Sequence, residues 1–578
     1  MVTTLAEARS ENVESADDPT EGPPRPRSQS RFAWWIAAAV VVSFALHVAI
    51  GMTDDAPSTD ETAYLGSGVS LVSGDGFERG GSPELHFPPF IPLLLGLGSK
   101  VFADPHVGAV WLTIVAGTAV VVPLALLARR LAGDRAGMAT AWLAALLPAV
   151  AVLPANRGAG SEAMYVLLLV TAVWLVVAAH DVAPGRPRTS RLLAAGGCVG
   201  LAYLSRPEGL FMAVPLAAAI AILAWRRATP SPSSARAGIG VAGKALAAFA
   251  VPIVLCIVPY AAYLHSHTDR WQLTAKTQDA SIEAWHAVAG SDREGRDKVL
   301  YELDETGYGL KAEMSSLTSL ALDDPGEYVG IVRTNVGQLF DMLVLPESEQ
   351  FLAWLIVPLP VWALVVAGVW RHRRSATMRL LLAVAALPVA TCLMFFVQPR
   401  YLMVTATLAA VPAGAALAAV PWPTRRWVAA ATAVLLVLST AQAFKGPGGW
   451  WHPADHTDQR DAGTWLADHA APGDRVMTRS LIIGYYAERP ALAIPYADLE
   501  TIVDFGQHYG AQYLVVDWYT AFRLRPQLRP LQKTDAFPGL RLVHEVRREG
   551  RTTRIFAFDP APSRDAPMGP SVNFTGDS

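Results

Sequence analysis

Two adjacent carboxylates, Asp60 and Glu61, stand shortly after an apolar run that extends from Phe32 to Gly51. A carboxylate that is partly buried beside a membrane has its pKa raised by desolvation, which suits a general base near neutral pH. The alternative interpretation is a pair of solvated acids at a membrane interface. Tyr64, one helical turn after Asp60, is either a binding residue of the same site or an interfacial aromatic residue.

Glu162 is a third acid that could carry chemistry. It begins an apolar run after a glycine-rich turn, and Ser161 before it is a typical helix N-cap. An acid at the start of a helix is also stabilised by the helix dipole without any catalytic role. A catalytic Glu162 would have to face the same compartment as Asp60.

Arg206 and Glu208 lie in a charged turn, Arg206-Pro207-Glu208-Gly209, where two apolar runs meet with almost no loop between them. Charged groups at membrane depth are costly unless they face a cavity or a partner. The alternative is a tight turn whose arginine extends to the membrane interface. A guanidinium suits a phosphate ligand, because its planar fork matches two phosphate oxygens.

A second arginine, Arg400, begins another apolar run within the segment Gln398-Pro399-Arg400-Tyr401. Like Arg206, it is a charged residue at the end of an apolar run, so we take Arg400 and the adjacent Tyr401 as candidates for binding the same anion. His86, in an earlier loop, is a further candidate for that cavity.

The composition of the 578-residue chain explains why these charges are informative. The chain is 52% hydrophobic and only 17% charged, with a mean hydropathy of +0.30. A soluble protein would have about 25% charged residues, and repeated apolar runs of membrane-spanning length indicate a polytopic membrane protein. The net charge of −3 gives no reason to expect nucleic acid as a partner. Cys198, Cys256 and Cys392 lie inside apolar runs as free thiols, without disulfide or metal spacing.

Eleven apolar runs are long enough to be membrane spans. We place them at residues 32–51, 108–128, 133–154, 162–179, 191–205, 209–225, 244–264, 351–370, 378–397, 402–420 and 427–443. The first is expected to be an uncleaved helix rather than a signal peptide. The span at 191–205 is short and glycine-rich, so it is either tilted or re-entrant.

The arginine clusters in short loops orient these spans. Five clusters fall on one face, which the positive-inside rule assigns to the cytoplasm: Arg129-Arg130, Arg186 with Arg188 and Arg191, Arg226-Arg227, Arg371 with Arg373 and Arg374, and Arg425-Arg426. The N-terminus is then inside and the C-terminus outside. Asp60, Glu162, Arg206 and Arg400 all fall on the extracytoplasmic face.

Three regions follow from this topology. Residues 1–30 are predicted to be a disordered cytoplasmic tail, 31–444 a transmembrane domain, and 445–578 an extracytoplasmic α/β domain with a loose C-terminal tail. Within the last region we expect helices at 455–470 and 498–509, and strands at 511–517 and 553–558. Residues 88–101 are expected to form an interfacial helix, and 292–303 a helix in a long external loop.

The expected site combines acids and arginines at one membrane boundary. Such a site fits a substrate with a phosphate at headgroup level and a hydroxyl nucleophile that arrives from the water. A sugar linked to a lipid phosphate meets both requirements, because breaking its glycosidic phosphate bond needs a base on the acceptor and positive charge near the departing phosphate.

These residues resemble the motifs of the C-type (GT-C) membrane glycosyltransferases of the protein O-mannosyltransferase and aminoarabinose transferase kind, families 39 and 83. The resemblance covers roughly residues 32–420. Its motifs are Asp60-Glu61-x-Ala-Tyr64, Pro88-Pro89 before an apolar stretch, Ser161-Glu162, Arg206-Pro207-Glu208-Gly209 and Gln398-Pro399-Arg400-Tyr401.

The resemblance implies a transferase that moves a sugar, with inversion, from a polyprenyl phosphate donor to an extracytoplasmic acceptor, which is a lipid, a cell-wall glycan or a protein. It implies that Asp60 is the leading catalytic base, that Glu162 is a second acid of the cavity, and that Arg206 and Arg400 contact the donor phosphate. The aminoarabinose transferases usually have lysine where this chain has Phe87 and Arg206.

Three other functions compete with this one. A transporter or lipid flippase would need charges near the bilayer midplane and usually repeated halves, and the sequence has neither. An oligosaccharyl-type transferase would need a divalent cation, for which Asp60 and Glu162 are candidate ligands without a third. No cofactor is assigned and the question of a cation stays open. The last alternative is a non-catalytic assembly scaffold.

Overall fold

The structure is a computed structural model that describes residues 27–52, 56–151, 161–179, 188–228, 235–276, 293–311, 317–344, 358–445, 456–548 and 550–570. Most of the predicted tail lies outside these ranges. The first helix, α1 (Arg27–Gly51), begins before the apolar run itself, so the last residues of the predicted tail are helical.

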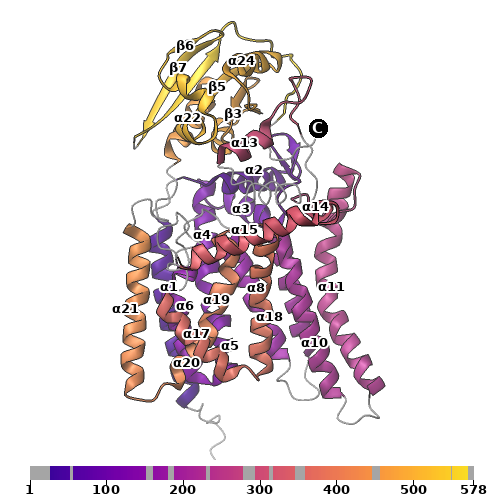
Figure 1. The fold of residues 1–578 in the computed structure, drawn as a ribbon, viewed down its shortest axis with the longest axis vertical. Helices are drawn as coiled ribbons and strands as arrows, with labels where there is room; N and C mark the ends of the chain where they lie inside the picture. The colour runs from indigo at the N-terminus through magenta and orange to yellow at the C-terminus, as the bar shows by residue number, and fades with distance from the viewer. Residues whose placement is uncertain are drawn as a thin grey trace, which may run out of the picture.

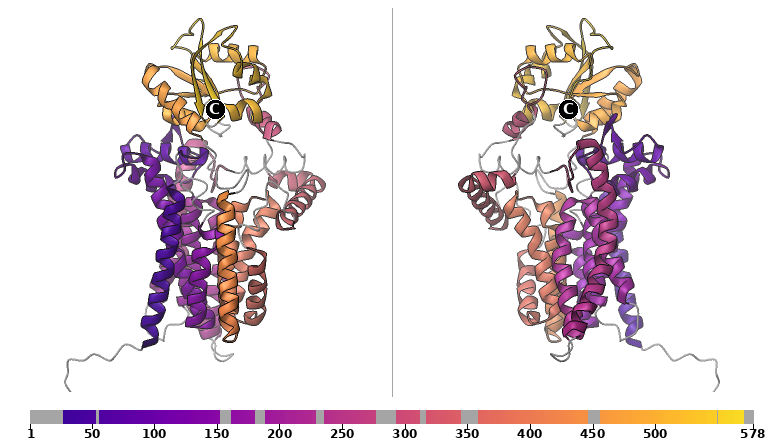
Figure 2. Two further views of the ribbon diagram at one scale, coloured as in Figure 1. Left: turned by 90° about the vertical axis from the view of Figure 1, so that its left-hand side faces the viewer. Right: turned by 90° about the vertical axis from the view of Figure 1, so that its right-hand side faces the viewer.

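A bundle of helices forms the body of the molecule (Figures 1 and 2). Its helices are α1, α4 (Pro105–Ala119), α5 (Val121–Ala132), α6 (Asp134–Leu146), α7 (Pro148–Ala151), α8 (Ser161–Ala179), α9 (Arg188–Ser205), α10 (Ala213–Ala228), α11 (Ala235–Thr268), α17 (Leu359–His372), α18 (Ala376–Met394), α19 (Met403–Leu408), α20 (Ala410–Ala419) and α21 (Thr424–Lys445). Within the described residues, seven helical segments are long and apolar enough by themselves to cross a membrane. The chain is therefore a multi-pass membrane protein.

Each predicted span is mainly helical where the structure describes it, although helix α18 ends at Met394, before the predicted end of its span at 397. Residues 152–154 of the third span and 351–357 of the eighth lie outside the described ranges. The exact number of eleven spans stays a prediction. The segment expected to be tilted or re-entrant is one continuous helix, α9.

Glycines explain why α9 carries so little apolar volume. A Cβ atom added at Gly196 would lie 2.0 Å from the carbonyl oxygen of Phe249, and one at Gly200 would lie 2.7 Å from the sulfur of Cys256. Both contacts belong to α11, so the two helices approach each other more closely than larger side chains permit. Small residues serve this purpose in membrane helix packing, where no hydrophobic effect drives helices together.

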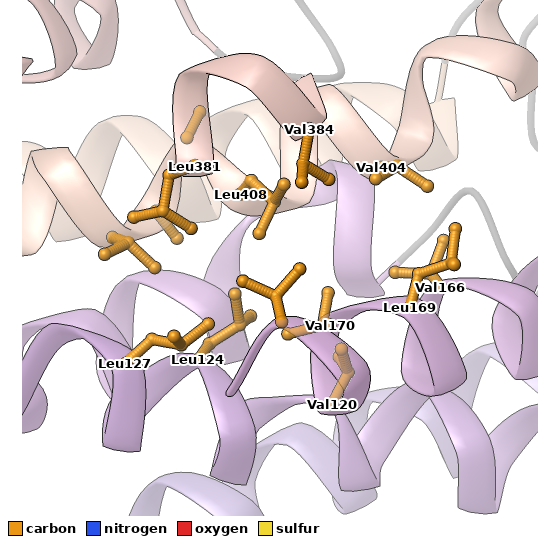
Figure 3. Close-up of a cluster of buried hydrophobic side chains, with 14 of the residues drawn as sticks. Val120, Leu124, Leu127, Val166, Leu169, Val170, Leu381, Val384, Val404 and Leu408 are labelled. Atoms are coloured by element: carbon orange, nitrogen blue, oxygen red, sulfur yellow. The ribbon is translucent and has the colours of Figure 1, made fainter. Parts of the chain in front are cut away.

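Branched side chains fill the centre of the bundle. Figure 3 shows Leu124 of α5, Leu169 of α8, Leu381 of α18 and Leu408 of α19, which belong to one apolar cluster. Each of these four side chains is at most 5% exposed. This packing holds the helix ends that carry the charged turns at fixed positions relative to one another.

A small layer covers one end of the bundle. It contains α2 (Thr59–Ser73), α3 (Phe90–Ser99) and a hairpin of β1 (Glu78–Arg79) and β2 (Ser82–Pro83). The expected interfacial helix at 88–101 is α3. Two glycines let α2 and α3 cross in contact, since a Cβ at Gly68 would lie 2.1 Å from the Pro92 carbonyl oxygen.

A longer connection follows α11 and contains three more helices. They are α13 (Arg293–Tyr301), which matches the helix expected at 292–303, α14 (Leu317–Asp323) and α15 (Pro325–Val344). In Figure 1, α15 runs across the end of the bundle at a large angle to the spans, and α13 lies against the C-terminal region.

The C-terminal region is an α/β unit with one six-stranded sheet in the order β4-β3-β5-β8-β7-β6. Strands β3, β4 and β5 are parallel, and the others pair antiparallel. Its elements are α22 (Thr457–His469), β3 (Arg475–Thr478), α23 (Leu481–Ala487), β4 (Ala491–Ala493), α24 (Leu499–His508), β5 (Ala511–Val516), the short helical turns Thr520–Leu524 and Pro526–Gln532, β6 (Ala536–Phe537), β7 (Leu540–Arg548) and β8 (Arg551–Phe558). The two predicted helices and two predicted strands are confirmed.

A buried ion-pair triad fastens α13 to this α/β unit. Asp297 of α13 lies 2.6 Å from Nε of Arg479 and 2.6 Å from Nε of Arg525, and Arg525 is fully buried. Burial by itself raises the pKa of a carboxyl group, but the two guanidinium groups hold the pKa of Asp297 below its ordinary value. The long connection and the C-terminal unit are therefore one assembly.

We expect Asp297→Asn to destabilise this assembly by about 3–5 kcal/mol, because it leaves two buried guanidinium groups without their counter-ion. The measurement is thermal unfolding of the purified full-length protein in detergent. The control is Asp323→Asn, at an exposed position of α14. Equal unfolding temperatures for Asp297→Asn and the control would show that the triad contributes no net stability.

Candidate active site

Asp60 reaches the site from the first turn of α2. The helix begins at the N-cap Ser58, whose hydroxyl oxygen accepts a hydrogen bond from the backbone N–H of Glu61 at 3.3 Å. The Glu61 carboxylate in turn accepts from the backbone N–H of Ser58, which completes a capping box. This fixed helix start directs the Asp60 carboxylate towards the bundle end, where its side chain remains about half exposed.

Arg400 meets Asp60 from the opposite side of the site. It lies in the 3-10 turn Pro399–Leu402, just before α19, and its Nη1 is 3.0 Å from Oδ2 of Asp60. Its Nε donates to the side-chain oxygen of Gln398 at 2.8 Å, so the guanidinium is held from two directions.

The Asp60–Arg400 contact corrects one expectation. Burial alone would raise the pKa of Asp60, as the sequence analysis predicted, but the cationic Arg400 and Lys276 outweigh it and hold that pKa at about 2. Asp60 is therefore a carboxylate at any physiological pH, and it is a weak base while Arg400 remains its partner.

Arg206 forms a second, more deeply buried group of ion pairs. It stands between α9 and the 3-10 turn Pro207–Met212, and its Nη1 donates to Glu162 at 2.7 Å and to the Ser161 hydroxyl at 3.2 Å. The Glu208 carboxylate lies 3.8 Å from its Nε. Two acids thus balance this arginine inside the bundle end.

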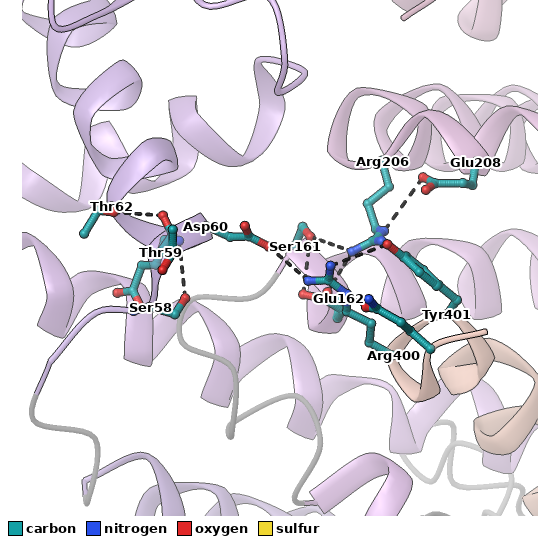
Figure 4. A network of polar contacts seen from close by, with 12 residues as sticks. Ser58, Thr59, Asp60, Thr62, Ser161, Glu162, Arg206, Glu208, Arg400 and Tyr401 are labelled. Carbon is teal, nitrogen blue, oxygen red and sulfur yellow. Dashed lines mark hydrogen bonds and ion pairs between the residues drawn. The ribbon is translucent and has the colours of Figure 1, made fainter. Parts of the chain in front are cut away.

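Tyr401 connects the two arginines. The guanidinium carbons of Arg206 and Arg400 lie 5.1 Å and 5.3 Å from the centre of its ring. Figure 4 shows the resulting arrangement, in which side chains from α2, α8 and the turns before α10 and α19 point towards one another. The structure therefore brings together six predicted site residues: Asp60, Glu162, Arg206, Glu208, Arg400 and Tyr401.

Glu61 points elsewhere. Its carboxylate is buried and lies 2.5 Å from Nδ1 of His106 in α4, in addition to its role in the capping box. The structure therefore does not bring Glu61 to the network around Asp60. Adjacent residues on a helix point about 100° apart, so two neighbouring acids rarely share one site.

The other two predicted residues border the network. Tyr64 is buried in a small apolar cluster, where its ring centre lies 4.5 Å from that of Phe87. The ring of His86 packs against Phe87 at 4.4 Å and lies near enough to Asp60 to contribute to lowering the pKa of that carboxyl. Both residues thus help to form the wall beside Asp60.

The structure adds Lys276, which the sequence analysis did not identify. Its ammonium lies 4.4 Å from the centre of the Phe87 ring, and it contributes to holding down the pKa of Asp60. Burial lowers the pKa of Lys276 itself. The available signal was Phe87, the position at which the resemblance to the aminoarabinose transferases implies a lysine. Lys276 reaches the ring of Phe87 from a distant loop.

Two hydrogen bonds hold the loop that carries Lys276. The fully buried Tyr203 of α9 donates from its hydroxyl to the Leu273 carbonyl at 2.7 Å, and the backbone N–H of Lys276 donates to Thr274 at 3.1 Å. A lysine in a long loop is thereby kept at a defined position beside the network.

The two acids considered as ligands of a divalent cation do not fit that role in this arrangement. Asp60 is paired with Arg400, and Glu162 with Arg206. In the ranges that the structure describes, no group of three or more His, Cys, Asp or Glu side chains is arranged to hold a metal ion.

Comparisons with known proteins bear on the fold that carries this network. Residues 86–255 match the family described as dolichyl-phosphate-mannose-protein mannosyltransferase. No curated protein sequence is significantly similar to the chain.

Solved structures provide the clearest likeness. ArnT from Cupriavidus metallidurans, bound to undecaprenyl phosphate, matches with a TM-score of 0.55 and 13% identity over 91% of this chain and 98% of that one. The oligosaccharyltransferase of Archaeoglobus fulgidus, in complex with zinc and sulfate, matches with a TM-score of 0.53 and 16% identity over 86% of this chain and 70% of that one. The oligosaccharyltransferase AglB from Archaeoglobus fulgidus, in complex with an inhibitory peptide and a dolichol-phosphate, matches with a TM-score of 0.51 and 14% identity over 85% of this chain and 70% of that one.

These matches extend over nearly the whole bundle and include the C-terminal region. Because the identities are low, the solved structures establish the fold alone. The family match adds sequence similarity to the mannosyltransferases over residues 86–255. The chain therefore has the fold of these membrane glycosyltransferases, and its residues 86–255 are similar in sequence to the mannosyltransferase family.

Proposed function

We propose that the protein transfers a sugar from a polyprenyl-phosphate-linked donor to an extracytoplasmic acceptor. The observation that carries this proposal is the Asp60–Arg400–Tyr401–Arg206 network at one end of a membrane bundle. The similar ArnT and AglB structures hold undecaprenyl phosphate and dolichol-phosphate, which supports a lipid-phosphate donor here. The acceptor is a lipid, a cell-wall glycan or a protein.

The proposed orientation places this network outside the cytoplasm. Arg129 and Arg130 occupy the last turn of α5, and Arg371 the last turn of α17. These are the helix ends far from the α/β unit in Figure 1, and arginines near short loops favour the cytoplasmic side. The N-terminus is then cytoplasmic and the C-terminal unit extracytoplasmic.

The donor phosphate would compete with Asp60 for Arg400. A phosphate with two oxygens matches a guanidinium better than a single carboxylate contact at 3.0 Å does. When Arg400 turns to the phosphate, Asp60 loses the partner that depresses its pKa and becomes a stronger base. Donor binding would thus activate the base that the acceptor requires.

The chemical step follows from these positions. Asp60 takes the proton of the acceptor hydroxyl as the acceptor oxygen attacks the anomeric carbon of the sugar. The bond between that carbon and the phosphate oxygen breaks, and the polyprenyl phosphate leaves with the electron pair. Arg400, Arg206 and Lys276 would stabilise the charge that develops on the leaving group. Inversion at the anomeric carbon is inferred from the family resemblance.

Glu162 has a different proposed role from Asp60. It and Glu208 hold Arg206 in place from two sides, and Ser161 accepts a further hydrogen bond from the same guanidinium. A buried arginine needs such partners before a ligand arrives. Glu162 would therefore position the arginine for the phosphate, and Glu61 would stabilise the start of α2.

The transporter alternative receives no support from this arrangement. The charges of the network gather at one end of the bundle, beside the layer formed by α2 and α3. Transport would require them near the midplane, where they could serve both faces.

We expect Asp60→Asn to lower the rate of sugar transfer by about 100- to 10,000-fold, because the variant cannot accept the acceptor proton. Transfer is measured by following loss of a polyprenyl-phosphate sugar with the purified protein, with and without a chelator. Glu61→Gln is the matched control: we expect it to lower the unfolding temperature while changing the transfer rate less than about 5-fold. Normal turnover by Asp60→Asn would remove this residue from the mechanism.

We expect Lys276→Met to raise the KM for the donor by about 10-fold, because one charge-assisted contact to the phosphate is lost. The control is Lys311→Met in the same long connection, where the lysine is exposed and 3.8 Å from Glu302. Inhibition by sugar-free polyprenyl phosphate should weaken in parallel with the change in KM. Unchanged inhibition of Lys276→Met would show that the lysine does not contact the phosphate.

A further inference from the structure

Helix α15 exposes an apolar stripe that no other described element covers. Val329, Val336 and Phe340 are 63%, 50% and 60% exposed. They are spaced at i, i+7 and i+11, so they lie on one face of the helix. Arg333, also exposed, lies within this stripe and carries a long stem that can extend to a polar layer.

The opposite face of α15 is anchored to the end of a span. Ile331 is fully buried in a small cluster that includes Tyr328 and Phe395. Asn335, also fully buried, donates from its side-chain nitrogen to the carbonyls of Leu393 at 3.1 Å and Phe395 at 3.0 Å.

These two carbonyls belong to the end of α18, which finishes at Met394. The last carbonyls of a helix have no partner inside the helix, and they must find donors elsewhere when they are buried. Asn335 supplies that donor from another segment. These hydrogen bonds hold α15 at the height where α18 ends, and they also stabilise the end of α18.

The level and angle of α15 identify what covers its apolar stripe. The helix crosses the end of the bundle in Figure 1 and projects from its side in Figure 2. A helix at the end of a span, with an apolar outer face and an arginine among the apolar residues, suits the boundary between headgroups and acyl chains. Leu322 of the preceding helix α14 is also exposed, at 78%.

We propose that α15 is a membrane-surface helix, seated in the leaflet on the side of the site, that holds the turn carrying Arg400 in place through Asn335. The turn begins five residues after Met394, so a displaced end of α18 would move Gln398 and Arg400 with it. The second part of this proposal rests on the proposed function, and the first part does not.

Spin labels test the membrane contact in lipid nanodiscs that hold one protein copy each. Val329→Cys, Val336→Cys and Phe340→Cys are made singly in a protein whose three native cysteines are replaced by alanine. Asp468→Cys, at an exposed position of α22, is the water-facing control. We expect labels on the stripe to be relaxed by oxygen more than by a water-soluble nickel complex, and the control to show the reverse. Stripe labels that behave like the control, or that are shielded from both reagents as in a protein interface, would overturn the proposal.

Asn335→Asp tests the coupling to the site, because it replaces the donor by an acceptor of the same shape. We expect the KM for the donor to rise at least 5-fold while the KM for the acceptor changes less than 2-fold. Tyr328→Phe is the control, since it removes only a 3.5 Å contact to Met394, and it should stay within 2-fold. Unchanged donor KM in Asn335→Asp overturns the positioning role, whereas absence of transfer in the unmodified protein would instead count against the proposed function.

Discussion

The structure depends on one long-range contact, the ion pair between Asp60 and Arg400. The two residues are 340 positions apart in the sequence and come from the layer above the bundle and from the start of a span. Their contact requires that α2 and the turn before α19 are both held against the same bundle end. The capping box of α2 and the cluster around Leu408 provide these two supports.

The network around this pair illustrates how a membrane protein keeps charges available for a ligand. A lone arginine at this depth would be costly, so Arg206 is matched by Glu162 and Glu208. Arg400 is matched by a single, half-exposed carboxylate. The less buried ion pair is the easier one to separate, and the more buried group holds the Arg206 guanidinium at a fixed position behind it.

Close approach of helices determines how these supports fit together. Glycines at the contacts of α9 with α11 and of α2 with α3 allow backbones to touch, which branched residues would prevent. The α/β unit adds a second level of constraint, because Asp297 ties the connection that follows Lys276 to Arg479 and Arg525. Elements far from the site in sequence thus contribute to its shape.

The sequence by itself determined the membrane-protein class, the approximate positions of the bundle helices and most of the charged residues that meet in the network, because apolar run length and charges at run ends are local properties. Only the tertiary structure decided that Glu61 turns to His106, that Arg400 depresses the pKa of Asp60, and that Lys276 reaches Phe87. Strands β3, β4, β6 and β7 of the C-terminal sheet were likewise missed. These features depend on which segments meet in the folded chain. The residues next to Asp60 and Lys276 in the sequence therefore do not predict the pKa of the one or the contact made by the other.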